Sequence, residues 1–261
     1  KMRILILLAF CVVAISALPS NPQRIVGGQL TTIDKYPEMV ALLYSTNLQI
    51  FTQSCAGSIL NNRFVLTAAH CLNGRNVIGR WRIRAGSTFA NSGGTVYNLD
   101  THIMHRDFVH QTFNNDIAIV RTANSIVYNN QVQAAFIAGS TYNLGDNEEV
   151  IAIGWGDTSY GGWPSEQLRD VQVWTVSHSE CARRYGSQGI GITPNMLCSG
   201  WLGVGGRDQC HGDSGGPLFH HGTVVGVCSF GLFCAHHFLP GVNVRVTRYV
   251  DWIQQNAVLR N

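Results

Sequence analysis

Three short blocks of the sequence each place one reactive side chain among small residues. The blocks are Thr67-Ala68-Ala69-His70-Cys71, Asn115-Asp116-Ile117-Ala118 and Gly212-Asp213-Ser214-Gly215-Gly216-Pro217. A serine hydroxyl becomes an effective nucleophile when a neighbouring imidazole takes its proton, and the imidazole needs a carboxylate that fixes its tautomer and stabilises its charged form. His70, Asp116 and Ser214 therefore predict a site for acyl transfer.

Glycine residues beside Ser214 allow a sharp turn of the backbone. In such a turn the amide groups of Gly212 and Ser214 can point together at an oxygen atom that gains negative charge. Removing one donor of this kind typically costs about 3–4 kcal/mol of transition-state stabilisation. We therefore expect Gly212 and Ser214 to form an oxyanion hole.

Short strands are the elements that must hold these blocks. The chain of 261 residues carries 28 glycines against 7 prolines and only 13% charged residues, which favours strands joined by tight turns over a helical bundle. Apolar or alternating stretches recur between turn-rich clusters. They span residues 38–44, 63–67, 81–85, 116–121, 150–153, 172–176, 223–228 and 242–246. The sequence predicts an all-β sandwich or barrel, followed by one amphipathic helix over residues 246–258.

The formal charge of +3 belongs to the first 24 residues. Residues 1–17 combine a basic start, a short apolar run and a small-residue end, which is typical of a secretory signal peptide and too short for a membrane span. Without Lys1, Arg3 and Arg24 the basic and acidic residues are equal in number. We therefore expect neither nucleic acid nor a membrane as a partner.

Eight cysteines in an exported chain indicate a disulfide framework. Cys11 lies in the signal peptide, so seven remain and at least one has no partner within the chain. Spacing alone does not choose among the possible pairings.

Together with Ile25-Val26-Gly27-Gly28 upstream, the three blocks resemble the chymotrypsin family of serine proteases, over residues 25–258. The resemblance implies a trypsin-like peptidase domain over residues 25–261, built from two antiparallel six-stranded Greek-key barrels that divide near residue 135 and a C-terminal helix. The active site would lie in the cleft between the barrels. The first barrel would supply the histidine and aspartate, and the second the serine.

The resemblance also selects three disulfides. They are Cys55–Cys71, Cys181–Cys198 and Cys210–Cys234. Each closes a loop for which chain entropy predicts about 3 kcal/mol of stabilisation. Cys228 is left over, and its apolar neighbours at 224–227 favour a buried, inert thiol.

Residues 18–24 form a short proline-containing segment that resembles an activation propeptide. In the family, hydrolysis at this place, here after Arg24, creates an ammonium group at Ile25 that pairs with the aspartate before the nucleophile, here Asp213. Burying Asp213 without that cation would cost several kcal/mol. We therefore expect the full chain to be an inactive zymogen.

Asp208 lies six residues before Ser214, at the position that forms the floor of the primary specificity pocket in this family. Gly231 and Gly241 fall on its two wall positions. A buried anion at the end of a narrow slot favours arginine or lysine before the scissile bond. The resemblance thus implies trypsin-like specificity.

Other pocket residues depart from the usual trypsin pattern. Phe230 stands where a tryptophan is common, although the backbone of Ser229, Phe230 and Gly231 can still pair with an extended substrate. Phe233 lies at the pocket rim and Gln209 beside the floor. The preference between arginine and lysine therefore stays open.

We expect no cofactor and no metal. The histidine pairs have no accompanying cysteine or carboxylate cluster at ligand spacing. The segment 85–99, where vertebrate trypsins hold calcium, contains no Asp or Glu, so no calcium site is expected there. The expected partners of a monomeric enzyme are protein and peptide substrates and protein trypsin inhibitors.

Lys35 is the only lysine after Arg24, beside fourteen arginines. Arginine keeps its charge in strongly alkaline medium, whereas lysine loses it. Residues 86–94 and 197–201 also resemble lepidopteran midgut trypsins, which work in an alkaline gut. These features favour an extracellular digestive enzyme of the gut lumen.

Two alternatives remain open. A regulatory cascade protease of narrow specificity would usually carry an N-terminal regulatory domain, but only about seven residues separate the signal peptide from Ile25. A protease-fold binding protein without catalysis would usually have lost one of His70, Asp116 and Ser214. The sequence therefore predicts a secreted digestive serine endopeptidase.

Overall fold

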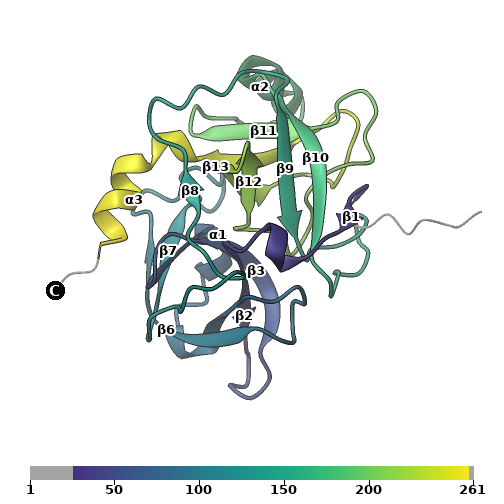
Figure 1. Cartoon of the computed structure of the whole chain (residues 1–261). Coiled ribbons are helices and arrows are strands. Elements are labelled where there is room, and N and C mark those ends of the chain that lie inside the picture. The colour runs from purple at the N-terminus through teal and green to yellow at the C-terminus, as the bar shows by residue number, and fades with distance from the viewer. Residues whose placement is uncertain (1–25, 259–261) are drawn as a thin grey trace, which may run out of the picture.

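The computed structural model describes residues 26–258 of the chain. Within them, two closed barrels of six antiparallel strands pack against each other, the first in the lower half of Figure 1 and the second in the upper half. This confirms the all-β architecture with two six-stranded barrels. The chain passes from the first barrel to the second between Thr122 and Phe136.

The first barrel pairs its strands in the order β2-β3-β4-β7-β6-β5. The strands are β2 (Met39–Tyr44), β3 (Thr52–Ile59), β4 (Phe64–Thr67), β5 (Trp81–Ala85), β6 (Thr95–Met104) and β7 (Ala118–Thr122). In β5 the side chains of Trp81, Ile83 and Ala85 are buried, while the two arginines between them are partly exposed. This alternation follows from the two-residue period of a strand with one face on the core.

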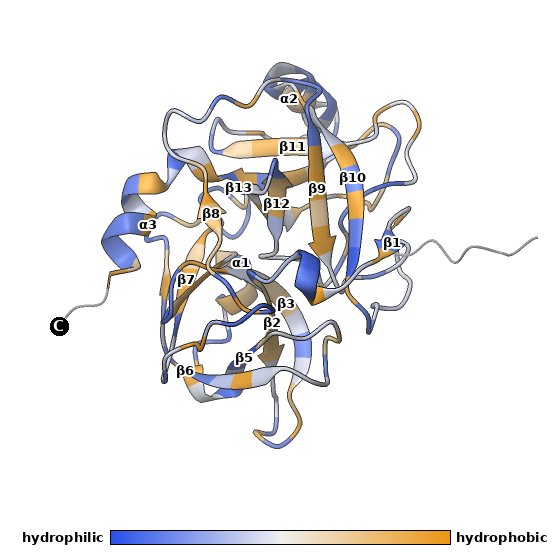
Figure 2. Cartoon of the chain, viewed as in Figure 1, coloured by the Kyte–Doolittle hydropathy of each residue, from blue (hydrophilic) through white to orange (hydrophobic). Residues whose placement is uncertain are grey.

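The second barrel pairs its strands in the order β9-β10-β11-β14-β13-β12, and β12 closes onto β9. The strands are β9 (Glu149–Gly154), β10 (Arg169–Val176), β11 (Met196–Gly200), β12 (Pro217–His220), β13 (Thr223–Phe230) and β14 (Gly241–Arg245). Figure 2 shows β9 as largely hydrophobic, in keeping with its buried side chains. Two short strands are added to this barrel: β1 (Gln29–Leu30) pairs with β10, and β8 (Phe136–Ile137) runs parallel to β13.

Each of the eight strands predicted from the sequence overlaps an observed strand, but β1, β3, β6, β8, β11 and β12 were not predicted. The predicted terminal helix is confirmed as a 3-10 turn, η3 (Val246–Arg248), followed by α3 (Val250–Asn256). Tyr249 and Ile253 are buried in the core that both barrels share, so α3 lies against the body of the molecule.

The remaining helices are short. They are α1 (Ala69–Leu72), α2 (His178–Gly186) and the 3-10 turns η1 (Ile33–Lys35) and η2 (Ile78–Arg80). α2 was not predicted; it covers a second small core around Cys181 and Tyr185. No helix between residues 26 and 258 combines the length and the hydrophobicity needed to cross a membrane.

Three disulfides join the cysteines in the pairs that the resemblance implied. They are Cys55–Cys71, Cys181–Cys198 and Cys210–Cys234. Cys228, in β13, is buried and has no disulfide partner among the described residues.

Candidate active site

His70 and Asp116 meet where two strands of the first barrel end. His70 belongs to α1, which follows β4 directly, and Asp116 lies two residues before β7, the strand paired with β4. The His70 amide donates to Asp116 Oδ1 at 2.7 Å, and His70 Nδ1 lies 2.7 Å from Asp116 Oδ2. Because a carboxylate only accepts hydrogen bonds, this contact places the ring proton on Nδ1 and leaves Nε2 as the basic nitrogen.

Asp116 is completely buried and accepts a third hydrogen bond, from Ser229 Oγ of β13 at 2.6 Å. This bond crosses from the second barrel to the first. Ser229, expected in the primary pocket, therefore also holds the carboxylate that orients His70. Hydrogen bonds to a charged group stabilise its charged form.

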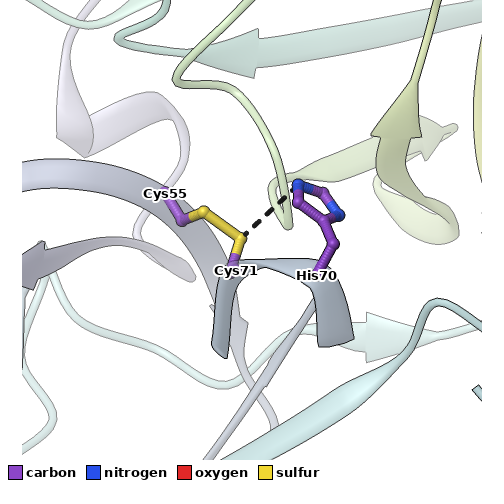
Figure 3. A group of neighbouring side chains, drawn as sticks. All are labelled: Cys55, His70 and Cys71. Atoms are coloured by element: carbon purple, nitrogen blue, oxygen red, sulfur yellow. Dashed lines mark hydrogen bonds between the residues drawn. A yellow bond between two sulfur atoms is a disulfide. The ribbon is translucent and has the colours of Figure 1, made fainter. Parts of the chain in front are cut away.

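Ser214 lies in the loop before β12, a strand of the second barrel. Its carbonyl accepts the Ala56 amide of β3 at 2.8 Å, so the loop is tied to the first barrel. Cys71 Sγ, in the disulfide with Cys55, lies 3.9 Å from His70 Nε2 (Figure 3). The same sulfur atom lies 3.7 Å from the Ser214 carbonyl oxygen. His70 and Ser214 line the same cavity, but no hydrogen bond joins their side chains in the described part of the chain. Catalytic hydrogen bonds are often long before a substrate binds.

The two amides expected to form the oxyanion hole are unpaired. Among residues 26–258, neither the Gly212 N–H nor the Ser214 N–H donates to a protein acceptor. Gly212 has φ +95°, a region that residues other than glycine rarely adopt. Two free N–H groups of neighbouring residues in one turn are suited to bind an anionic oxygen atom.

Asp208 lines a cavity of about 250 Å³ that His70 and Ser214 also line. Its side chain is 2% exposed, and its two oxygens accept the backbone amides of Gln209 at 3.0 Å and Ala235 at 3.1 Å. No basic side chain in the described part of the chain forms an ion pair with it. Burial therefore raises the pKa of Asp208 to about 8, although the two amides act in the opposite direction.

Gly241 and Gly231 line this cavity as expected. A Cβ atom on Gly241 would lie 2.7 Å from Asp208 Oδ1 and 3.3 Å from Gln209 Nε2, so a side chain there would block the floor. Gln209 Nε2 is buried and has no hydrogen-bond partner among the described residues. The amide of Gln209 thus shares the cavity with the carboxylate of Asp208.

Some lining residues were not expected from the sequence. Phe113 packs its ring 5.5 Å from the His70 ring and 5.2 Å from the Phe230 ring, centre to centre. Phe113 has φ +54°, in the left-handed region, and no sequence motif predicts this conformation. Cys228 also lines the cavity, and burial raises the pKa of its thiol well above the usual value.

Asp213 is buried beside the Ser214 turn. Its two oxygens accept the backbone amides of Gly156 at 2.7 Å and Cys210 at 2.8 Å, and burial raises its pKa to about 7. Its expected partner Ile25 and the expected cleavage residue Arg24 lie outside the described residues. The first described residue, Val26, accepts the Asp208 amide through its carbonyl at 3.1 Å.

Two groups of histidine and cysteine side chains come close together in the described chain. One contains Cys55, His70 and Cys71, and the other Cys210, His211 and Cys234. In both groups the cysteines form a disulfide, so they offer no thiolate to a metal.

Within the segment 85–99, two backbone carbonyls bind a guanidinium group. The carbonyl of Asn91 accepts from Arg84 at 3.0 Å, and the carbonyl of Gly93 accepts from the same guanidinium. These oxygens already accept hydrogen bonds from a cation that the chain itself supplies.

Comparison with known proteins agrees with this geometry. The family profile described as Trypsin matches residues 25–253. The alkaline trypsin C of Manduca sexta is 60% identical over 97% of this chain and 98% of its own length, and trypsin CFT-1 of Choristoneura fumiferana is 56% identical over the same shares. Achelase-1 of Lonomia achelous is 51% identical over 89% of this chain and its own full length. The chain therefore belongs to the trypsin family of serine endopeptidases.

Proposed function

We propose that the protein is a secreted digestive endopeptidase that hydrolyses peptide bonds after arginine or lysine. One observation carries this proposal: Asp208 is a buried carboxylate without a cation, in a cavity that His70 and Ser214 also line. A substrate guanidinium or ammonium group would neutralise it, and a guanidinium could bind both oxygens at once. The same cavity then holds the scissile bond near the reactive groups.

In the proposed reaction, Ser214 Oγ attacks the carbonyl carbon of the substrate and its proton passes to His70 Nε2. The amides of Gly212 and Ser214 bind the resulting oxyanion. The C–N bond then breaks, and His70 gives its proton to the departing amine. Water attacks the acyl-enzyme by the same route, and Asp116 stabilises the imidazolium in both halves.

Asp208→Ser tests the specificity. In this variant kcat/KM for an arginyl substrate should fall by orders of magnitude, because the bound cation loses its partner. Asp107→Ser is the matched control, since the Asp107 side chain is 62% exposed beside Arg106. Little loss of arginyl cleavage in Asp208→Ser rejects the assignment of the pocket. Parallel assays on arginyl, lysyl and phenylalanyl substrates define the preference.

We also propose that cleavage after Arg24 activates a zymogen. The new ammonium at Ile25 would pair with Asp213, which is buried and would gain a neutralising charge. Arg24→Gln should leave a secreted but inactive protein, whereas Arg106→Gln, at a side chain that is 91% exposed, should not affect activation. Full activity of uncleaved Arg24→Gln contradicts the switch. Because Arg24 is itself a residue of the preferred type, the enzyme could activate its own precursor.

The alkaline working range is a further part of the proposal. Lys35 is the single lysine after Arg24, and three similar proteins of Manduca sexta are named alkaline trypsins. A free α-amino group has a pKa of about 7.7–8.0, so the Ile25 ammonium survives in alkaline medium only when pairing with Asp213 raises its pKa. That stabilisation is complete below the ordinary value and is lost as pH rises through the raised value. Loss of this pairing should therefore set the alkaline limit of activity, and an optimum at or below about pH 8 counts against an alkaline working range.

Labelling with an organophosphonate separates the enzyme from a non-catalytic binding protein. The cleaved protein should incorporate one label at Ser214, and His70→Ala should abolish it. Absence of label in the cleaved wild type would favour a binding role.

A further inference from the structure

The side chain of Gln53 connects the two barrels beside the Ser214 turn. Gln53 lies in β3 of the first barrel, and its Nε2 donates to the carbonyl of Gly212 at 2.7 Å and to the carbonyl of Cys55 at 3.2 Å. The first of these bonds joins residues 159 positions apart in the sequence. It reaches the residue whose N–H is one of the two unpaired amides of the turn.

The two peptide units that meet at Gly212 are each held by one further backbone hydrogen bond: the His211 carbonyl accepts the Asp157 amide at 2.7 Å, and the Asp213 amide donates to the Cys210 carbonyl at 3.0 Å. Of the two backbone polar groups of Gly212 itself, only the carbonyl is hydrogen-bonded in the described part of the chain, and Gln53 is the donor. Glycine can rotate about both of its backbone bonds at low cost. The bond to Gln53 fixes the peptide unit that follows Gly212 and so limits rotation between that unit and the one that carries the Gly212 N–H. Without this bond, the Gly212 N–H is held less firmly toward the place where a substrate oxygen would lie.

Gln53 is itself held in place from the second barrel. Its backbone amide donates to Asn91 Oδ1 at 2.8 Å. Asn91 is fixed by Glu166, whose two carboxylate oxygens accept the backbone amide and Nδ2 of Asn91 at 3.0 Å and 2.8 Å. The Asn91 side chain thus turns its oxygen toward Gln53. Glu166, Asn91, Gln53 and Gly212 form a continuous chain of hydrogen bonds that ends at the turn.

We propose that Gln53 is a positioning residue, which holds the Gly212 carbonyl so that the Gly212 N–H stays directed at the oxyanion. This inference rests on the proposed function, because it assumes that an oxyanion forms there. The bond to Gln53 should matter in the transition state, when the oxygen becomes charged, and hardly at all for a cation that only fills the pocket above Asp208.

Gln53→Met tests the inference, because methionine is similar in length but has no donor. Loss of a whole oxyanion donor typically lowers kcat by about 100–1,000-fold. A loosened donor retains part of its effect, so we expect kcat for an arginyl substrate to fall about tenfold with little change in KM. Gln133→Met is the matched control, since Gln133 Nε2 likewise donates to a backbone carbonyl, that of Asn129 at 2.7 Å, on an exposed part of the chain.

Two inhibitors separate positioning from general damage. Benzamidine fills only the cationic pocket, and its Ki should be the same in wild type and Gln53→Met. A peptide arginal is attacked by Ser214 Oγ, and the resulting hemiacetal places its oxygen at the Gly212 amide; its Ki should rise about as much as kcat falls. Asn91→Ala should give a smaller loss in the same direction, because Gln53 keeps its side chain and loses its support.

Three other outcomes would contradict either the inference or the proposed function. If both inhibitors weaken equally in Gln53→Met, Gln53 supports the fold or the pocket and the inference is wrong. If neither inhibitor weakens and kcat is unchanged, Gly212 needs no support from Gln53, and the inference is also wrong. If wild type fails to bind benzamidine or to cleave arginyl substrates, the proposed function itself fails.

Discussion

The ionisation of Asp208 should control how tightly the pocket binds a cation at different pH values. Burial raises the pKa of this carboxyl to about 8 in the empty pocket. A protonated carboxyl carries no charge to attract an amidinium or guanidinium group. At pH 6, two units below that pKa, only about 1% of the empty pockets hold a carboxylate, which weakens cation binding about 100-fold, or about 2.7 kcal/mol.

Benzamidine is a suitable probe, because its amidinium group keeps its charge over this range. We expect its Ki to fall about tenfold for each pH unit up to about pH 8 and to be constant above that value. Calorimetry at pH 6 in two buffers of different ionisation enthalpy should show release of nearly one proton as the inhibitor binds. Because a histidine in the same cavity can also make binding depend on pH, the series is repeated with His70→Ala.

A constant Ki from pH 6 to pH 9 in both wild type and His70→Ala would refute the reasoning. Asp208 would then be ionised throughout, which would mean that the amides of Gln209 and Ala235 outweigh the effect of burial. A pH dependence that disappears in His70→Ala would assign the effect to the imidazole and not to the pocket.

Three further outcomes are expected from the same structure. Ser229→Ala removes one of the three hydrogen bonds to buried Asp116; it should lower kcat about tenfold and stability by about 2 kcal/mol, measured by kinetics and thermal unfolding. EDTA should not change the melting temperature of the cleaved protein, because Arg84 already binds the loop carbonyls; a fall of several degrees would reveal a bound metal. The Cys228 thiol should react with a disulfide reagent at pH 8 only after denaturation, and rapid reaction of the native protein would contradict its burial.

The elements that could be predicted from the sequence are those that keep a regular pattern of burial. β5 alternates large apolar and charged residues, and its bounds match the prediction. β3 contains Ser54, Gly57 and Ser58, small residues that fit beside other chain segments but give no hydrophobic period. Its place between β2 and β4 depends on contacts that are not local in sequence.

α2 could have been found from a different signal. Ser177 Oγ accepts the amide of Glu180 at 3.2 Å, and Ser177-His178-Ser179-Glu180 is a capping-box pattern at a helix start. The helix buries only Cys181 and Tyr185, so its apolar stripe is too narrow to attract notice.

The candidate site likewise has parts that the sequence predicts and parts that it does not. Blocks around His70, Asp116 and Ser214 are visible because small residues flank a reactive one in each. The hydrogen bond from Gln53 to Gly212 could not be predicted in this way, because no local pattern around a glutamine in a strand indicates which carbonyl 159 residues away it will contact. Long-range polar contacts of this kind are settled by how the barrels dock.

The division of the site between two barrels also has a consequence for biosynthesis. His70 and Asp116 are complete with the first barrel, but Ser214 and Asp208 arrive only with the last quarter of the chain, and Ser229 reaches Asp116 only after docking. Domains generally fold as units from the N-terminus during synthesis. A chain that has formed only its first barrel therefore holds the base His70 and the carboxylate that orients it, but no nucleophile, so it cannot cleave other proteins in the cell that makes it.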